Sequence, residues 1–309
     1  VNKIKSVQLP ANTSKLDKNT FVNKDNVVVD VYIDSETLGA FVADETTSKY
    51  HRIIKKAIPE EQAPWGVKDF TYDEAGTTIT GLSDSGKVKI QKNPSLILPK
   101  EGPDGKAITA LGAGANNQGI FVVSADDKNY TPASVMLPDT LKTIGNFAFQ
   151  SNGLKDVTFP SKLAKIGTGA FQTNELTSVI LPDTVTSLGN GVFATNPKLA
   201  RINLSKGLTE IPAAAFGCSD AKNYMTELKS ITIPEGITKI GNNAFAGNNF
   251  AEIHIPSTVT EIGGYAFSTK EYLTDPCTLT LPEGLTTIGS YAFRNKVVAE
   301  VMLPTTVKK

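Results

Sequence analysis

The chain has 309 residues, of which 40% are hydrophobic and 20% are charged, and its formal net charge is zero. This is the composition of a folded protein with a sizeable core. The balanced charge argues against nucleic acid or an acidic membrane surface as the main partner. No run of about 18 apolar residues occurs, so no segment is predicted to insert into a membrane.

Only two cysteines and two histidines are present. This small supply does not favour a metal site, a disulfide scaffold or a catalytic nucleophile with its base. We therefore predict neither enzyme activity nor a cofactor. A disulfide between Cys218 and Cys277 is left open.

Residues 1–60 contain a unit that recurs further along the chain. Val7 and Leu9 alternate as in a half-buried strand, Pro10 follows them, and Phe21 comes eleven residues after the proline. Another strand is expected around Val31, and residues 44–57 are predicted to form an amphipathic basic helix that closes this block. Residues 1–60 are thus interpreted as the tail of an upstream repeat block.

Residues 61–92 are predicted to be a junction segment. Aromatic and β-branched residues at 70–72 and 78–80 indicate a hairpin, which a short helix follows. The run from Gly81 to Lys87 has the spacing of a phosphate-binding loop. However, Val88 stands where that loop needs a serine or threonine, so we predict no nucleotide site here.

Residues 93–309 form the main repeat array. Leu96, Ile97 and Leu98 before Pro99 mark a degenerate first repeat, and a long insertion at 114–133 separates it from about seven regular repeats. The regular repeats are marked by these prolines and one serine: Pro138, Pro160, Pro182, Ser205, Pro234, Pro256, Pro282 and Pro304. Their successive spacings are 22, 22, 23, 29, 22, 26 and 22 residues.

Each repeat carries the same apolar residues in the same order. Eleven residues after the proline or serine stand Phe149, Phe171, Phe193, Phe216, Phe245, Phe267 and Phe293. Alternating apolar residues before the proline predict a strand, and a glycine such as Gly145 after the next apolar residue predicts a turn with positive φ. A coil of 22 residues cannot bury this apolar face alone, so neighbouring coils must stack, with parallel strands about 4.8 Å apart.

The sequence therefore predicts a leucine-rich-repeat solenoid, a right-handed β/α superhelix dominated by β-structure. The units LPDTLKTIGNFAFQSNGLKDV, IPEGITKIGNNAFAGNNFAEI and LPEGLTTIGSYAFRNKVVAEV resemble the BspA-like leucine-rich-repeat family of bacterial cell-surface proteins over residues 134–309. Many members of that family carry cysteine three positions after the phenylalanine. Here asparagine mostly stands there, as Asn152, Asn174, Asn196 and Asn248, while Cys218 comes one place early.

The resemblance implies an extracellular or surface-attached protein with a role in adhesion, and it brings no catalytic residues. We expect a signal peptide and an anchor to lie outside this sequence, which ends within a repeat. The expected partner is an extracellular protein or glycan. The alternative is a structural spacer that presents another module of a longer surface protein.

Candidate partner-binding residues come from two places. The first is the outward side of the strands, expected to form a concave face, with Met136, Ile180 and His254 in one column and Arg201 in the column beside it. The second is a pair of insertions that interrupt the array and contain the candidates Tyr224, Met225 and Tyr272.

The last predicted strand of the array holds Val301, Met302 and Leu303. It is expected to be an open edge, and such an edge favours end-to-end self-association.

Overall fold

The computed structural model describes residues 64–115, 118–125, 128–217, 227–269, 276–298 and 301–307, and the backbone of three strands before them. The chain divides into two compact units, Val1–Pro64 and Trp65–Lys309. In the first unit, strands β1 (Ser6–Gln8), β2 (Val29–Tyr32) and β3 (His51–Ile54) form one parallel sheet in that order.

The expected strands near Val7 and Val31 are confirmed as β1 and β2. The helix predicted over 44–57 is wrong at its centre, because His51–Ile54 is β3 and pairs with β2 over four residues. Two adjacent isoleucines suit a strand, and pairing with a neighbouring strand overrides the helical pattern of the sequence. The remainder of 44–57, and the repeat residues around Phe21, lie outside the described residues.

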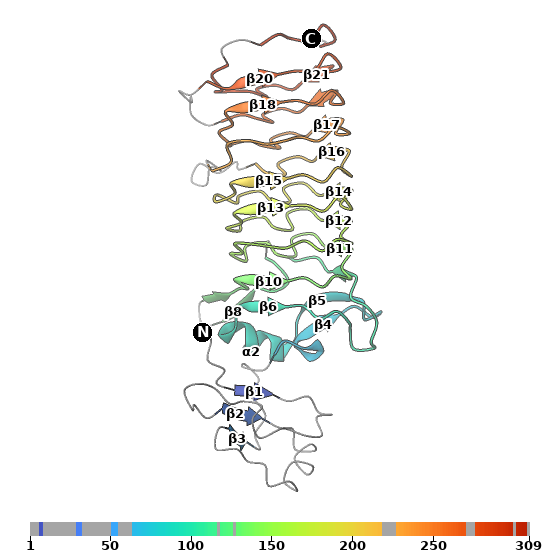
Figure 1. Cartoon of the computed structure of the whole chain (residues 1–309), viewed down its shortest axis with the longest axis vertical. Helices are drawn as coiled ribbons and strands as arrows, with labels where there is room; N and C mark the ends of the chain where they lie inside the picture. Colours follow the sequence, from blue (N-terminus) through green and yellow to red (C-terminus); the bar gives the residue numbers. More distant parts are fainter. Residues whose placement is uncertain are drawn as a thin grey trace. The chain divides into compact units, whose positions relative to one another are not determined.

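The second unit is a stack of coils with a ladder of short parallel strands on each of two sides (Figure 1). One ladder contains β6 (Ser95–Ile97), β10 (Ser134–Met136), β13 (Ser178–Ile180), β15 (Arg201–Asn203), β18 (Glu252–His254) and β20 (Thr278–Thr280). The second ladder contains β7 (Ala110–Leu111), β11 (Thr143–Ile144), β12 (Lys165–Ile166), β14 (Ser187–Leu188), β16 (Glu210–Ile211), β17 (Lys239–Ile240), β19 (Glu261–Ile262) and β21 (Thr287–Ile288). Among the described residues of the regular array there is no helix.

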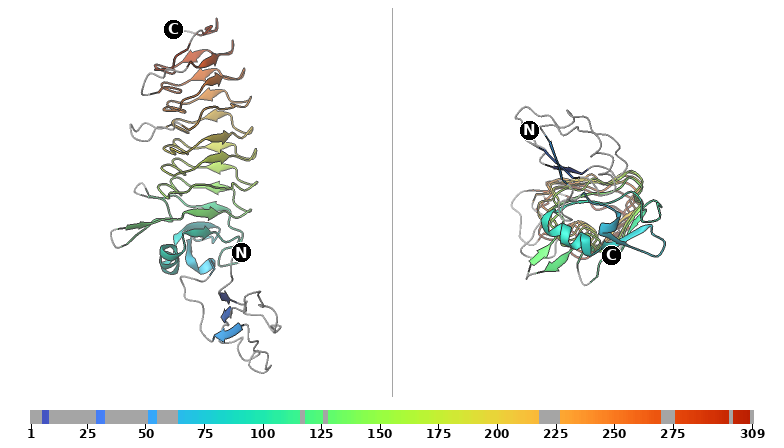
Figure 2. Two further views of the ribbon diagram at one scale, coloured as in Figure 1. Left: turned by 60° about the vertical axis from the view of Figure 1, so that its left-hand side comes forward. Right: turned by 90° about the horizontal axis from the view of Figure 1, so that it is seen from below.

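This layout confirms the predicted β-dominated solenoid and explains why the stack shows little curvature (Figures 1 and 2). A solenoid curves when its two sides have different spacings. Here both sides are parallel strand ladders, whose spacing is about 4.8 Å on either side. The face expected to be concave is therefore nearly flat.

A ladder of phenylalanine rings runs through the interior of the stack. Successive rings lie 5.1 to 5.6 Å apart between centroids, with interplanar angles of 3° to 30°. The predicted residues from Phe149 to Phe293 all belong to it. Phe121, which the sequence analysis assigned to an insertion, begins the ladder by stacking on Phe149 at 5.2 Å. Within that insertion, β8 (Val123–Ala125) and β9 (Lys128–Tyr130) form an antiparallel hairpin.

Buried asparagines form a second interior ladder beside the rings. Asn174 Nδ2 donates to the carbonyls of Phe149 at 2.8 Å and Phe171 at 3.0 Å, and its Oδ1 accepts from Leu154 N at 3.0 Å. Asn196 repeats all three bonds one coil further on. These amides satisfy backbone groups that would otherwise be buried without partners, which explains asparagine at the position where the family often has cysteine.

The repeat glycines have a different role from the one predicted. Gly145 is not among the residues with positive φ; a Cβ added there would lie 2.4 Å from Gly112 O, so the glycine lets two backbones approach closely. Positive φ occurs two residues later, where each coil makes its turn. Those turn positions are Phe147, Gly169, Gly191, Ala214, Asn243, Tyr265 and Tyr291, with φ from 55° to 62°. Residues other than glycine are strained there, by about 1–2 kcal/mol each.

The junction segment caps the array. Strands β4 (Phe70–Tyr72) and β5 (Thr78–Leu82) form the predicted hairpin, and β5 pairs in parallel with β7. Helix α2 (Asp84–Lys92) follows, and the 3-10 turn η1 (Val67–Asp69) precedes the hairpin. A Cβ on Gly86 would lie 2.0 Å from Asp69 O, so the glycine in the loop-like run serves the packing of α2 against η1.

A buried ion pair joins η1 to α2. Lys89 Nζ donates to Asp69 Oδ2, both side chains are fully buried, and the ammonium lies 5.3 Å from the ring centroid of Trp65. Asp69 also accepts from Gly66 N at 2.8 Å and Ser85 Oγ at 2.8 Å. Burial alone raises the pKa of Asp69, but the bonds from Lys89, Gly66 and Ser85 outweigh it and hold the pKa below its ordinary value of 3.8.

Replacing one ring of the phenylalanine ladder is expected to destabilise the whole unit. Phe193→Ala removes a fully buried ring that stacks on Phe171 and Phe216, so we expect a loss of about 3–5 kcal/mol in the free energy of unfolding. Chemical denaturation followed by circular dichroism measures it, with the exposed Thr186→Ala as control. A melting temperature unchanged within a degree or two would contradict stacking as the source of stability.

The buried ion pair makes stability depend on pH in a defined direction. Asp69→Asn leaves the Lys89 ammonium buried without its carboxylate, which should cost roughly 3–5 kcal/mol at pH 7. Because the folded pKa of Asp69 lies below the unfolded one, its stabilisation is complete above the unfolded pKa and disappears as the pH falls through the folded pKa. Urea unfolding at pH 7 and pH 3 should therefore show a smaller difference between the native chain and Asp69→Asn at the lower pH. The double variant Asp69→Asn, Lys89→Met is the control and should recover part of the loss.

Candidate recognition surface

The outward side of the first ladder, which we call the strand face, is the main candidate surface. Inward residues such as Val179, Ile202 and Ile253 are buried, while their neighbours on each strand point outward. The outward column is Ile97, Met136, Thr158, Ile180, Asn203, Thr232, His254, Thr280 and Met302, and every member is exposed. The predicted alternation of inward and outward residues is thus confirmed.

Three large apolar residues lie in the first part of this column. Ile97 is 45% exposed, Met136 is 63% exposed and Ile180 is 49% exposed. Met136 and Ile180 were predicted, whereas Ile97 was missed because its repeat is degenerate. Its place two residues before Pro99 is the signal that identifies it. β10 pairs with β6 in a register that sets Met136 directly opposite Ile97.

A groove of about 380 Å³ opens on the strand face beside Ile180. It exists because the first ladder is interrupted here: Val157 makes only an isolated bridge to Val135, and β13 pairs with β15 on its other side. The groove lies between Thr158 and Ser178, with the mostly buried Phe159 among its lining residues. Its lining combines apolar side chains such as Ile180 and Leu181 with the hydroxyl groups of Thr158 and Ser178 and the carboxylate of Asp156, a mixture that suits binding of another molecule.

Of the other predicted binding residues that the structure describes, only Arg201 lies close to this groove. Arg201 lies on β15, in the exposed column next to the one that holds Ile180. His254 and Glu252 are exposed on β18, further along the array. Among the described residues, no three His, Cys, Asp or Glu side chains come together as a metal site would require. Tyr224, Met225 and Tyr272 lie outside the described residues.

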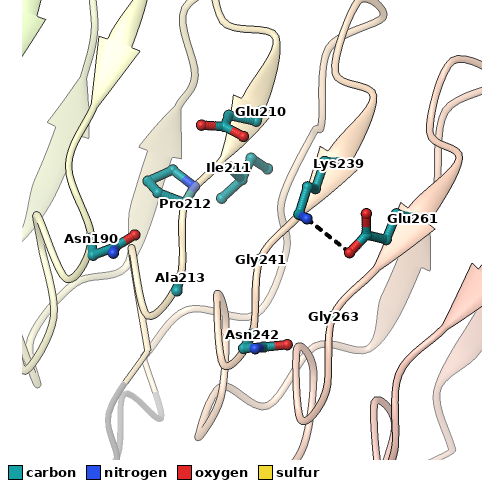
Figure 3. Close-up of a pocket in the computed structure, with 10 residues that line it drawn as sticks. All are labelled: Asn190, Glu210, Ile211, Pro212, Ala213, Lys239, Gly241, Asn242, Glu261 and Gly263. Atoms are coloured by element: carbon teal, nitrogen blue, oxygen red, sulfur yellow. Dashed lines mark ion pairs between the residues drawn. The ribbon is translucent and has the colours of Figure 1, made fainter.

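A second, smaller groove of about 210 Å³ lies on the other ladder (Figure 3). Glu210, Lys239 and Glu261 project from β16, β17 and β19, and Lys239 Nζ pairs with Glu261 Oε1 at 2.9 Å. The hydrogen bond and the charge of Glu261 raise the pKa of Lys239, so this ammonium stays charged. Both partners are about half exposed, and the cation sits in a row with two carboxylates. The row has one positive and two negative groups, and because the ion pair is half exposed it contributes little energy and gives no reason to propose a ligand.

Two predictions concern the C-terminal end of the array: an edge strand and self-association through it. The strand expected at Val301, Met302 and Leu303 is not formed, since these residues are irregular and 38%, 83% and 65% exposed. Among the described residues, the last bridge between two coils of this side joins Pro276 to Val297. The edge strand predicted at this segment is therefore wrong. End-to-end self-association of the chain through this segment is not tested and stays a prediction.

Cys277 is a free and buried thiol, and burial raises its pKa, which keeps it neutral. Its proposed partner Cys218 lies outside the described residues. No helix in the described part of the chain is long and apolar enough to cross a membrane.

Comparison with known proteins places this architecture. A search of curated proteins found no match. Among solved structures, the pneumococcal vaccine antigen PcpA is similar, with a TM-score of 0.51 and 20% identity over 77% of this chain and 68% of that one. A leucine-rich-repeat protein from Bacteroides ovatus gives a TM-score of 0.44 and 19% identity over 75% and 69% of the two chains. A leucine-rich-repeat protein from T. pallidum gives a TM-score of 0.42 and 22% identity over 60% of this chain and 86% of that one.

At 20% identity the match to PcpA establishes the fold alone. The sequence itself matches the BspA type leucine rich repeat region, in six copies, over residues 128–225 and 220–309. Proteins with such repeats are generally recognition or surface proteins rather than enzymes. The repeat register, the stacked coils and this match together show that the chain belongs to the BspA-type leucine-rich-repeat family.

Proposed function

We propose that this chain is a secreted or surface-displayed bacterial recognition protein that binds an extracellular protein or glycan through its strand face. The observation that carries the proposal is the set of exposed apolar side chains Ile97, Met136 and Ile180, the last of which lines a groove, on a face whose other outward residues are mostly polar. Large apolar side chains gathered on one face are what a partner removes from water on binding.

The family and the shape of the surface support this proposal. The match to the BspA-type repeat and the similarity to a pneumococcal vaccine antigen both fit display outside the cell. The strand face is held by a packed core on its inner side, so a partner loses little affinity to reordering of the protein. Adhesion to a host matrix or to another cell is the proposed role.

The structural spacer is the second candidate. The phenylalanine ladder runs without a break from Phe121 to Phe293, which favours a stiff rod that holds another module at a distance. A spacer needs this core but does not need exposed apolar residues on one face. The two functions therefore differ in what happens when those residues are replaced.

The double variant Met136→Thr, Ile180→Thr tests the strand face. Threonine already occupies this column at Thr158 and Thr280, so the variant should fold like the native chain. Binding of the full chain to immobilised fibronectin, fibrinogen, laminin, collagen and a glycan array identifies the partner. We expect the double variant to bind that partner at least roughly tenfold more weakly, as for two residues at the centre of an interface.

Val88→Thr is the matched control, because Val88 is also an exposed apolar residue, 46% accessible, but lies on α2. Its affinity should equal that of the native chain. Unchanged affinity of the double variant would contradict the strand face as the site. Binding of the native chain to none of these surfaces would favour the spacer.

A further inference from the structure

Two tyrosines occupy strained turn positions that mostly smaller residues fill elsewhere in the array. On five earlier coils the same position holds Phe147, Gly169, Gly191, Ala214 and Asn243. On the next two coils it holds Tyr265 with φ 58° and Tyr291 with φ 60°. Glycine and asparagine adopt this positive-φ conformation with less strain than tyrosine, so the packing of the coils does not explain tyrosine at these two positions. Phe147 is strained in the same way, but the two tyrosines also carry hydroxyl groups and Tyr291 is exposed, which points to a role in binding.

The two rings form a cluster with an arginine. Tyr265 and Tyr291 stack with centroids 5.0 Å apart at 29°, and Tyr291 is 60% exposed. The guanidinium carbon of Arg294, which comes three residues after Tyr291, lies 5.6 Å from the centroid of the Tyr291 ring. We call these three residues the tyrosine cluster.

The polar groups of the tyrosine cluster are unused. Among the described residues, neither tyrosine hydroxyl has a hydrogen-bond partner, and the Arg294 guanidinium makes neither a hydrogen bond nor a salt bridge. The neighbouring turn residues Asn243 and Ser290 carry no charge. An exposed guanidinium held against a ring, with two free phenolic hydroxyls beside it, is suited to receive a carboxylate.

We propose that Tyr265, Tyr291 and Arg294 form a binding site for glycans whose sugar rings carry a carboxylate. Arg294 pairs with the carboxylate through its planar donors, the tyrosine hydroxyls bond the ring hydroxyls, and the exposed aromatic surface contacts the apolar C–H groups of the sugar. The cluster is three residues on a ridge of turns. That is far smaller than the roughly 800 Å² that each partner contributes to a stable protein interface, but it matches one sugar ring.

This site goes beyond the proposed function, because it lies in the turns that follow β19 and β21 and not on the strand face. The two sites therefore respond to different substitutions. Loss of binding in the Met136 and Ile180 variant reports on the strand face, and loss in the tyrosine cluster reports on the glycan site.

The test measures binding of the full chain to α2,3-sialyllactose and to hyaluronan oligosaccharides, with lactose and cellohexaose as neutral comparators. The two acidic probes separate a sialic acid from a uronic acid as the source of the carboxylate. We expect one or both to bind, with affinity that falls as salt is added. Arg294→Gln should weaken binding roughly tenfold or more, and Arg294→Lys should restore only part of it, because the bidentate geometry is lost.

Tyr291→Asn and Tyr265→Asn separate binding from folding. Asn243 occupies the equivalent place, so these variants should melt at the same temperature as the native chain or higher, while binding of the acidic glycan is lost. Phe147→Asn is the matched control: Phe147 has the same strained φ of 58° but no arginine three residues later, and its replacement should leave binding unchanged.

Equal binding of neutral and acidic glycans, or no binding of either, would overturn the proposal. So would acidic glycan binding that survives Arg294→Gln, or binding of polyglutamate in place of the acidic glycans.

Discussion

The stacking of one coil on the next is the interaction on which the rest of this structure depends. A strand ladder repeats at about 4.8 Å, and aromatic rings stack comfortably at slightly more than 5 Å, so one phenylalanine per coil fills the interior at almost the pitch that the backbone imposes. The observed centroid separations of 5.1 to 5.6 Å show this match. The buried asparagines and the repeat glycines follow from the same constraint. Asparagine bonds backbone groups of neighbouring coils, and glycine allows two backbones to meet.

This core leaves the outer positions of the coil free to vary. On the strand face the outward column holds apolar, hydroxyl, amide and imidazole side chains on different coils, while the inward residues stay apolar. At the turns, the strained position accepts glycine, alanine, asparagine, phenylalanine or tyrosine on different coils, with φ always between 55° and 62°. Recognition can therefore be placed on the surface of the solenoid without altering the fold, and this is where both proposed sites lie.

Much of the fold could be predicted from the sequence because the period of the repeat is itself the signal. The regular spacing of Phe149 to Phe293 gave the ring ladder, and the alternation at Val179 and Ile180 gave the inner and outer sides of a strand. The predictions failed at positions where the spacing of the repeat residues does not determine the structure. Phe121 reaches the ladder across an insertion, and β3 forms through pairing with β2 despite a helical pattern. The role of Gly145 depends on the distance to Gly112 in another coil, which a single repeat does not reveal.

The candidate sites were less predictable than the core. Met136 and Ile180 follow from their column, but the groove beside Ile180 arises from an interruption of the first ladder that local sequence does not show. Tyr265 and Tyr291 had a signal, because two successive repeats carry tyrosine where the others carry mostly small residues. The sequence does not show that these tyrosines have positive φ or that Arg294 lies over the Tyr291 ring, and the proposed site depends on both facts.

Stacking makes the coils one rigid unit that presents preorganised surfaces. Native-state hydrogen exchange of the backbone amides that bond from coil to coil tests it most directly. Phe171 N, which donates to Val192 O, and Phe245 N, which donates to Ala266 O, lie in separate parts of the array. We expect both amides to exchange with the same free energy of opening, equal to that of global unfolding, because each coil depends on its neighbours. Opening at clearly different free energies, well below that of global unfolding, would show that the coils are independent segments and would contradict the account.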